Sequence, residues 1–218
     1  MTRVEAKAMP STIRRAVHTC IYASVSYKLW GEVPARHAIL MQLRFDGLIG
    51  FPGGLVDPSQ PDSDVLEDLE VAANRELKEE LSDLIQVTSG DYKYAIYLPS
   101  ENIICHFFMK KVNEDLLTQL EHSALTAPDR FEVCGTLRVP CYELPQSGGK
   151  TPGGFPNFIT QRFAGNALQQ LLHACREAEL IPKEMFHRAV RQANVTHLLL
   201  NRSTFIHSDA GTIDPSVL

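Results

Sequence analysis

Seven residues of this sequence, RELKEEL at 75–81, carry five charged side chains, and three of these are carboxylates. Like charges three or four residues apart on a helix repel one another, so such a run is unfavourable unless something compensates it. Glu76 and Glu80 are one helical turn apart, and Glu79 lies beside them. A divalent cation would compensate several converging carboxylates, so the run points to a metal site. The alternative is a solvated helix in which Arg75 and its neighbours form surface ion pairs.

The helix that must present these carboxylates is expected over residues 65–81, with Ser63 and Asp64 as N-cap candidates. At about 100° per residue, one face of this helix collects apolar side chains. They are Leu66, Leu69, Ala73, Leu77 and Leu81. Glu80 falls within this apolar face and Glu76 at its edge. A carboxylate there is costly to hold ionised unless a cation compensates it.

A loop rich in Gly, Pro, Ser and Asp, GGLVDPSQPDSD at 53–64, precedes the helix. It follows the strand-like segment that contains GFPGG, so a tight backbone turn is expected just upstream of the helix. Such a turn allows phosphate to approach main-chain N–H groups. The context therefore favours the metal-site interpretation over the solvated helix.

The remaining elements are read from periodicity and turn residues. Strands are expected at 16–24, 37–45, 85–99, 102–112 and 131–140. Further helices are expected at 113–125, 158–180 and 183–195, with a flexible loop at 147–154. Because strands and helices alternate, the fold class is α/β, with a mixed sheet sandwiched between helices. We expect a flexible N-terminus at 1–14, one domain at 15–200 and a disordered tail at 201–218.

Composition narrows the class of protein. A chain of 218 residues with 44% hydrophobic content suits a single buried core, and its net charge of -5 argues against a broad basic surface. The five cysteines show no CxxC or Cys/His spacing, which favours reduced thiols over disulfides or zinc. We see no signal peptide and no apolar run of the roughly 18 residues that a membrane span requires. A soluble, intracellular protein is therefore expected.

The sequence resembles the Nudix box: a Gly, five residues, Glu, seven residues, then Arg-Glu, an aliphatic residue, any residue and Glu-Glu. Arg75-Glu76-Leu77-Lys78-Glu79-Glu80 matches the second half in full. Twelve residues separate Gly54 from Glu67 instead of five, and Ser82 stands where the family has Gly. Either Glu67 or Glu70 takes the place of the early Glu. Across about residues 16–175, the chain is similar to Nudix hydrolases of the snoRNA-decapping, inosine diphosphate phosphatase type.

This resemblance implies a Nudix fold and a site for Mg²⁺ or Mn²⁺. Glu76, Glu79, Glu80 and the carbonyl of Gly53 would be ligands, and Arg75 would orient the glutamates. Glu132 is the candidate for a further acidic ligand or base, with a solvated glutamate as its alternative. The expected substrate-binding residues are His18, Arg44, Phe51 and Gln170. Taken alone, Phe51 would be a core residue, His18 a satisfied strand histidine and Gln170 helix surface.

The leading hypothesis is metal-dependent cleavage of phosphoanhydride bonds. The expected substrates are inosine or deoxyinosine di- or triphosphates and capped RNA. One alternative is a non-catalytic relative that binds RNA or protein, although such relatives have lost the glutamates present here. Another is a Nudix enzyme that acts on ADP-ribose-type substrates. The resemblance also implies a homodimer and a location in the nucleus, including the nucleolus, or the cytoplasm.

Overall fold

The computed structural model describes residues 1–59, 65–144 and 152–200. Its strands are β1 Arg14–Ser24, β2 Lys28–Leu29, β3 Val33–Pro34, β4 His37–Arg44, β5 Ile49–Gly50, β6 Gly53–Leu55, β7 Tyr92–Leu98, β8 Ile103–Val112 and β9 Val133–Arg138. Its helices are α1 Arg3–Ala8, α2 Leu69–Leu81, α3 Glu114–Ser123, α4 Phe155–Phe158, α5 Ala167–Glu177, α6 Lys183–Gln192 and α7 His197–Leu200, with a short 3₁₀ turn, Ser89–Asp91.

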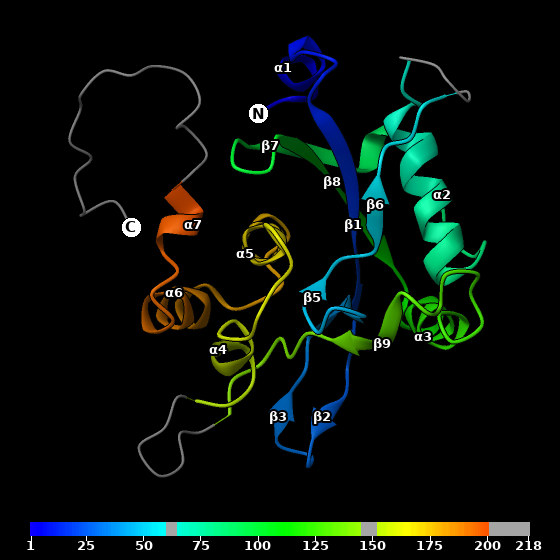
Figure 1. Cartoon of the computed structure of the whole chain (residues 1–218). Coiled ribbons are helices and arrows are strands. Elements are labelled where there is room, and N and C mark those ends of the chain that lie inside the picture. Colours follow the sequence, from blue (N-terminus) through cyan, green and yellow to red (C-terminus); the bar gives the residue numbers. More distant parts are fainter. Residues whose placement is uncertain (60–64, 145–151, 201–218) are drawn as a thin grey trace, which may run out of the picture.

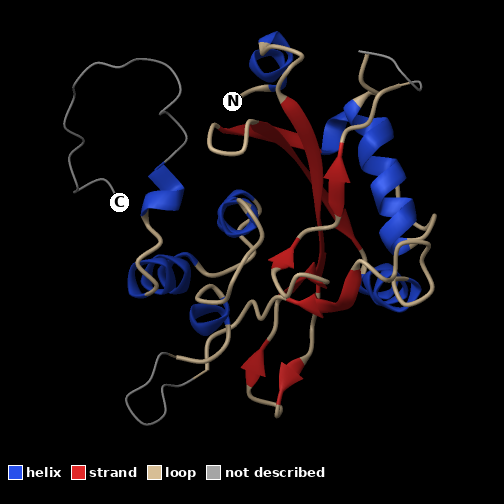
Figure 2. Cartoon of the chain, in the orientation of Figure 1, coloured by secondary structure: helices blue, strands red, loops and turns tan. Residues whose placement is uncertain are grey.

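A mixed sheet forms the centre of the molecule, as expected from the sequence. β1 pairs in parallel with β8 and antiparallel with both β4 and β6. It is therefore the central strand of the sheet. β9 adds to β4, and β7 adds to β8. Figures 1 and 2 show α2 and α3 on one face of this sheet and α4, α5 and α6 on the other. The α/β/α sandwich is confirmed.

Alternate residues of β4 enter the two cores on either side of the sheet, as the period of two in a strand requires. Ile39 and Met41 belong to the core beneath α5 and α6, whereas Ala38 and Leu40 belong to the core beneath α2 and α3. Both faces of this strand are therefore buried, which explains its nearly continuous apolar sequence.

The carboxylate helix α2 begins at Leu69, four residues later than expected. Residues 65–67 instead pair with the outgoing loop: Ser59 N–H donates to the Val65 carbonyl (2.7 Å), and Glu67 N–H donates to the Asp57 carbonyl (2.9 Å). The N-cap position is Asp68. The expected caps at 63 and 64 lie outside the described residues, as do most of the expected loop at 147–154 and the tail at 201–218.

The expected helix at 158–180 is confirmed only over α5, Ala167–Glu177, because α4 ends at Phe158, where the expected helix begins. The chain between α4 and α5 runs beside β5, where Ile49 N–H donates to the Arg162 carbonyl (3.0 Å) and Ala164 N–H donates to the Ile49 carbonyl (2.9 Å). Gly165, at φ +46°, then turns the chain into α5. The other expected helices, at 113–125 and 183–195, are confirmed as α3 and α6.

The segment expected to be flexible, residues 1–14, contains a short helix. Residues 3–8 form α1, which is closed by a capping box between Thr2 and Glu5. Arg3 binds both carboxylate oxygens of Glu70 on α2, and Ala6 is fully buried. This short helix is therefore tied to the main body of the domain.

All five cysteines are free in this structure, and Cys134 alone among them is exposed. No helix within the described ranges has the length and apolar character needed to cross a membrane.

Candidate active site

A cavity of about 550 Å³ lies where α2, the turn at β6 and the amino end of α5 meet. All of the site residues proposed from the sequence line it. They are His18, Arg44, Phe51, Gly53, Arg75, Glu76, Glu79, Glu80, Glu132 and Gln170. The fold therefore gathers these residues from distant parts of the chain, while the role of each remains a prediction.

Arg75 occupies the centre of the carboxylate cluster. Its Nη1 lies 2.8 Å from Glu76 and 3.1 Å from Glu79, and its Nη2 lies 2.8 Å from Glu67. Nη2 also donates to the Leu55 carbonyl at 2.9 Å. A guanidinium has five N–H donors in a fixed plane, so it can hold several acceptors in defined directions. This geometry suits the expected role of Arg75 in orienting the glutamates.

The two candidates for the early glutamate have different partners. Glu67 contacts Arg75 and also accepts the Asp57 N–H at 3.0 Å. Glu70 lies against Arg3 instead, whose hydrogen bond holds the pKa of the Glu70 carboxyl below its usual range. Of these two residues, Glu67 is the one that joins the cluster around Arg75.

Glu80 is 9% exposed, and among the described residues it forms no ion pair. Its Oε2 accepts the Gly53 N–H at 2.8 Å. Burial above all, together with the nearby Glu76 carboxylate, raises the pKa of Glu80 to about 8. Arg44 lowers the pKa of Glu80 from a distance, but no cation in the described structure lies in direct contact with this buried carboxylate.

The carboxylate oxygens of Glu80 and its neighbour Glu76 are the kind of ligand that a hard divalent cation prefers. Burial also raises the pKa of Glu76, so the site holds two carboxyl groups that a positive charge would help to ionise. In the described part of the chain, however, no three acidic, His or Cys side chains are already grouped as a metal centre. Arg75 instead binds Glu76 and Glu79. The expected role of the Gly53 carbonyl as a metal ligand stays a prediction.

Two adjacent glycines allow the sheet and α2 to approach this closely. A Cβ at Gly53, which has φ +137°, would lie 2.0 Å from the Val17 carbonyl oxygen. A Cβ at Gly54 would lie 2.6 Å from the carboxylate of Glu76. The GG pair is thus required where β6 pairs with β1 and faces the carboxylates.

His18 and Gln170 meet across the cavity from β1 and α5. Gln170 Nε2 lies 3.2 Å from His18 Nδ1, and Gln170 is 1% exposed, so it is not a helix-surface residue. Burial, followed by the charge of Arg44, lowers the pKa of His18 to about 4. His18 is therefore a neutral imidazole at physiological pH. Arg44 is held by Asp46, with Nη2 3.2 Å from the carboxylate.

Phe51 is 3% exposed and packs edge-to-face on Phe107, with ring centroids 5.3 Å apart. It lines the cavity but belongs to the apolar core beneath α5. In this conformation the contacts of the ring favour the core alternative over an open stacking surface for a purine.

Glu132 is exposed and precedes β9, at the edge of the cavity. Asp129 lines the same edge, and its N–H donates to the Glu79 carbonyl at 2.9 Å, which ties this loop to α2. Sequence reasoning missed Asp129. It also missed Asn166, the N-cap residue of α5, whose buried Nδ2 has no hydrogen-bond partner in the described structure. The Gly-Asn pair before ALQQLL could have indicated this helix start.

The helix–sheet–helix sandwich and the REL-x-EE helix ordered around Arg75 define this protein as a Nudix hydrolase. The family model described as "Nudt16-like: U8 snoRNA-decapping enzyme-like" matches residues 15–181. The chain belongs to this Nudt16-like family.

Curated relatives of two kinds support this membership. The U8 snoRNA-decapping enzyme of Mus musculus is 38% identical over 181 residues, covering 81% of this chain and 88% of its own. The Tudor-interacting repair regulator protein of Homo sapiens is 33% identical over 195 residues, covering 88% and 87%. Among solved structures, a mutT/nudix family protein from Listeria innocua overlaps with a TM-score of 0.44 and 20% identity, over 77% of this chain and 96% of that one.

Proposed function

We propose that this protein hydrolyses phosphoanhydride bonds in a metal-dependent reaction. Its proposed substrates are inosine or deoxyinosine di- and triphosphates and capped RNA. The observation that carries the proposal is the buried Glu80, which has no cationic partner in the described structure and lies in the same cavity as His18 and Arg44. The similarity to proteins named U8 snoRNA-decapping enzymes supports the RNA part.

Glu76, Glu79 and Glu80, with the Gly53 carbonyl, would hold Mg²⁺ or Mn²⁺. When bound, the ion neutralises phosphate oxygens and makes a bound water more acidic. Arg75 keeps two of these carboxylates directed toward the cavity. Glu132 and Asp129, at the edge of the cavity, are the residues available to accept a proton from the attacking water.

The other end of the cavity would hold the nucleoside. With the Gln170 amide donating to Nδ1, the neutral His18 ring carries its proton on Nε2. That N–H can donate to an acceptor such as the 6-oxo group of hypoxanthine, whereas the 6-amino group of adenine is a donor. Arg44 supplies a positive charge for a phosphate group.

The test compares the wild type with Glu80→Gln on inosine diphosphate and on a capped RNA, with Mn²⁺ or Mg²⁺ present. We expect Glu80→Gln to lower product release about 100-fold or more, because metal assistance stabilises the transition state by several kcal/mol. Glu32→Gln, an exposed residue on the β2–β3 hairpin, is the matched control and should keep full activity.

Product release by the wild type that is no higher than that of Glu80→Gln or of the protein-free background would instead favour a binding protein without catalysis, whereas equal release well above background would show that the reaction does not depend on Glu80. The 33% identity to Tudor-interacting repair regulator proteins makes the first of these outcomes worth measuring. ADP-ribose in the same substrate panel tests the other Nudix alternative. We further propose a homodimer acting in the nucleus or cytoplasm, to be tested by light scattering of the purified chain and by imaging of a tagged copy.

A further inference from the structure

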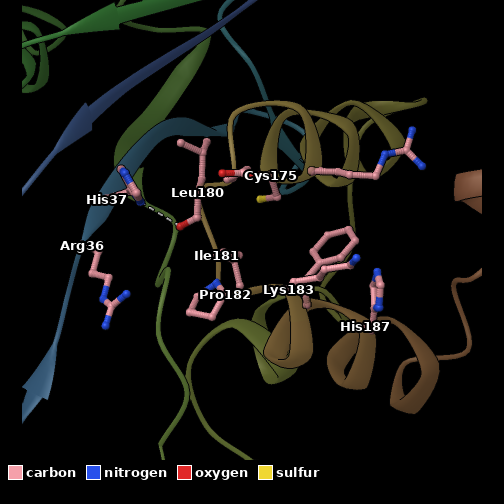
Figure 3. Close-up of a pocket in the computed structure, with 11 residues that line it drawn as sticks. Arg36, His37, Cys175, Leu180, Ile181, Pro182, Lys183 and His187 are labelled. Carbon is pink, nitrogen blue, oxygen red and sulfur yellow. Dashed lines mark hydrogen bonds between the residues drawn. The ribbon is translucent and has the colours of Figure 1, made fainter. Parts of the chain in front are cut away.

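A second cavity, of about 570 Å³, lies between the start of β4, the carboxyl end of α5 and the amino end of α6 (Figure 3). It shares no lining residue with the active-site cavity. The two cavities lie at opposite ends of α5, since Gln170 lines the first and Arg176 the second. They also lie at opposite ends of β4, where Arg44 and His37 are seven residues apart. That spacing corresponds to roughly 23 Å along a strand.

Basic side chains surround this second cavity. Arg36, Arg176 and Lys183 line it together with two histidines, and Glu179 is its only acidic lining residue. Within the described ranges, Arg36 and Lys183 form no ion pair, unlike Arg75. The whole chain has a net charge of -5, so this group of cations is a local feature. Such a concentration of unpaired cations attracts an anion.

The floor of the cavity is apolar and firmly held. Leu180, Ile181 and Phe186 are each 3% exposed or less. Leu180 N–H donates to the Cys175 carbonyl, and the Leu180 carbonyl lies 3.0 Å from His37 Nδ1. Because a carbonyl can only accept, Nδ1 carries the proton and the His37 Nε2 atom remains available to a ligand. Figure 3 shows His37 directed at the Leu180 carbonyl from the β4 side.

The amino end of α6 adds further hydrogen-bond donors. Its first intrahelical bond runs from Phe186 N–H to the Pro182 carbonyl (2.9 Å), and no side chain caps the helix. The N–H groups of the preceding residues therefore have no partner within the helix, and this end carries partial positive charge. Lys183, the first residue of α6, lines the cavity. Phosphate groups are typical ligands of this arrangement.

We propose that this cavity is a second nucleotide-binding pocket, with the base on the apolar floor and its phosphate bound by Lys183 at the amino end of α6. Arg36 and Arg176, on other sides of the cavity, would hold neighbouring phosphates of an RNA strand. A nucleotide combines a flat, largely apolar base with an anion, and this cavity offers both environments in a volume typical of ligand sites. A free nucleotide and one nucleotide of an RNA strand present the same chemistry. The RNA source rests on the proposed function, because the strand would extend from the active-site cavity to this pocket.

The test uses the full chain in EDTA, so that binding is measured without hydrolysis. Adenosine monophosphate and a fluorescein-labelled, uncapped 12-nucleotide RNA are the probes. The Arg36→Ala/Lys183→Ala variant should weaken binding about tenfold or more, because hydrogen bonds to charged groups are lost. For the RNA, the slope of log K against log salt should fall by about 1.4, at roughly 0.7 per phosphate contact. Activity on inosine diphosphate should be unchanged.

The matched control is Lys93→Ala/Lys111→Ala, which removes the same charge from exposed positions outside this cavity. Weakened binding of both probes identifies a pocket for free nucleotides, and weakened binding of RNA alone identifies a contact with the RNA strand. Unchanged affinity for both probes would overturn the proposal. So would an aspartate-rich peptide that competes as strongly as the RNA. If the double variant does not fold, Arg36→Gln and Lys183→Gln are measured singly.

Because no probe is hydrolysed, loss of catalysis and loss of this pocket are separate results. A chain that binds RNA here but never releases product would refute the proposed function and leave the pocket in place.

Discussion

Glu80 combines two properties that are in tension: its carboxylate is largely buried, and it lines a cavity suited to charged ligands. Its pKa of about 8 means that the folded protein holds a proton there at neutral pH when no cation is bound. A cation and this proton therefore compete for the same carboxylate.

Stability without metal should depend on pH through Glu80. Its pKa is about 8 in the folded chain and near 4.5 when exposed, so the folded state binds more protons between these values. Stability should fall as pH rises through this window, by up to about 1.4 kcal/mol per pH unit. Glu80→Gln removes this dependence. Urea unfolding in EDTA from pH 5 to 9 measures both proteins, and parallel curves would contradict the assignment.

Arg75→Lys should disorder the carboxylates while keeping the positive charge. A single ammonium cannot reproduce the three contacts with Glu67, Glu76 and Glu79. We expect kcat/KM to fall about 10- to 100-fold, the range found when residues that orient metal ligands are changed. Mn²⁺ affinity should fall as well, which separates a positioning effect from general loss of stability. Arg188→Lys, on an exposed pair with Glu143, is the control.

At this scale the sequence predicted residues that line one cavity, and it did so for a physical reason. The 3.6-residue period of a helix fixes how Glu76, Glu79 and Glu80 are placed relative to the apolar face. Phe51 shows the limit. An aromatic residue beside a turn suits either a core or a stacking surface, and only packing on Phe107 distinguishes them. Asp129 was missed because the loop that brings it to Glu79 has no periodic pattern.

At the scale of elements, α2 ends at an unusual residue. Ser82, which stands where the Nudix pattern has Gly, adopts φ +68° and ψ 175°. This region of backbone space is strained for any residue with a Cβ and costs about 1–3 kcal/mol. The departure from the pattern therefore affects the end of the helix.

Ser82→Gly should stabilise the protein by about 1 kcal/mol, because the relief of strain exceeds the added flexibility of the unfolded chain. Chemical denaturation measures the change, and catalytic activity should be unaltered. Ser26→Gly, at an exposed position without positive φ, should be neutral or slightly destabilising. A Ser82→Gly protein no more stable than the wild type would contradict the strain argument.

The elements mispredicted from sequence are those shaped by long-range contacts. Residues 159–166 are helix-compatible, but 162–164 among them pair with Ile49 of β5, and residues 65–67 pair with the loop at 57–59. Local propensity is a weak signal where the chain can hydrogen-bond to a distant strand. The first residues similarly gain order from Arg3 and Glu70, which are far apart in sequence.

At the scale of the whole molecule, cation binding should stabilise the fold. Mn²⁺ at 100 times its dissociation constant should add about 2.7 kcal/mol to the free energy of unfolding. At one fixed Mn²⁺ concentration, the gain should increase from pH 6 to 9, because the affinity for the ion rises as Glu80 loses its proton. Thermal unfolding with and without Mn²⁺ measures it, and EDTA should reverse it. A gain of equal size in Glu80→Gln would place the ion elsewhere.

The thiols described above offer a practical consequence. Burial raises the pKa of Cys105 and Cys141 to about 12, and those of Cys20 and Cys175 are raised as well. Cys134 is the exposed one, two residues from Glu132 on the rim of the active-site cavity. A maleimide dye should consequently attach to the unmutated protein at this one position. Its emission would then report directly on ligands entering or leaving the cavity.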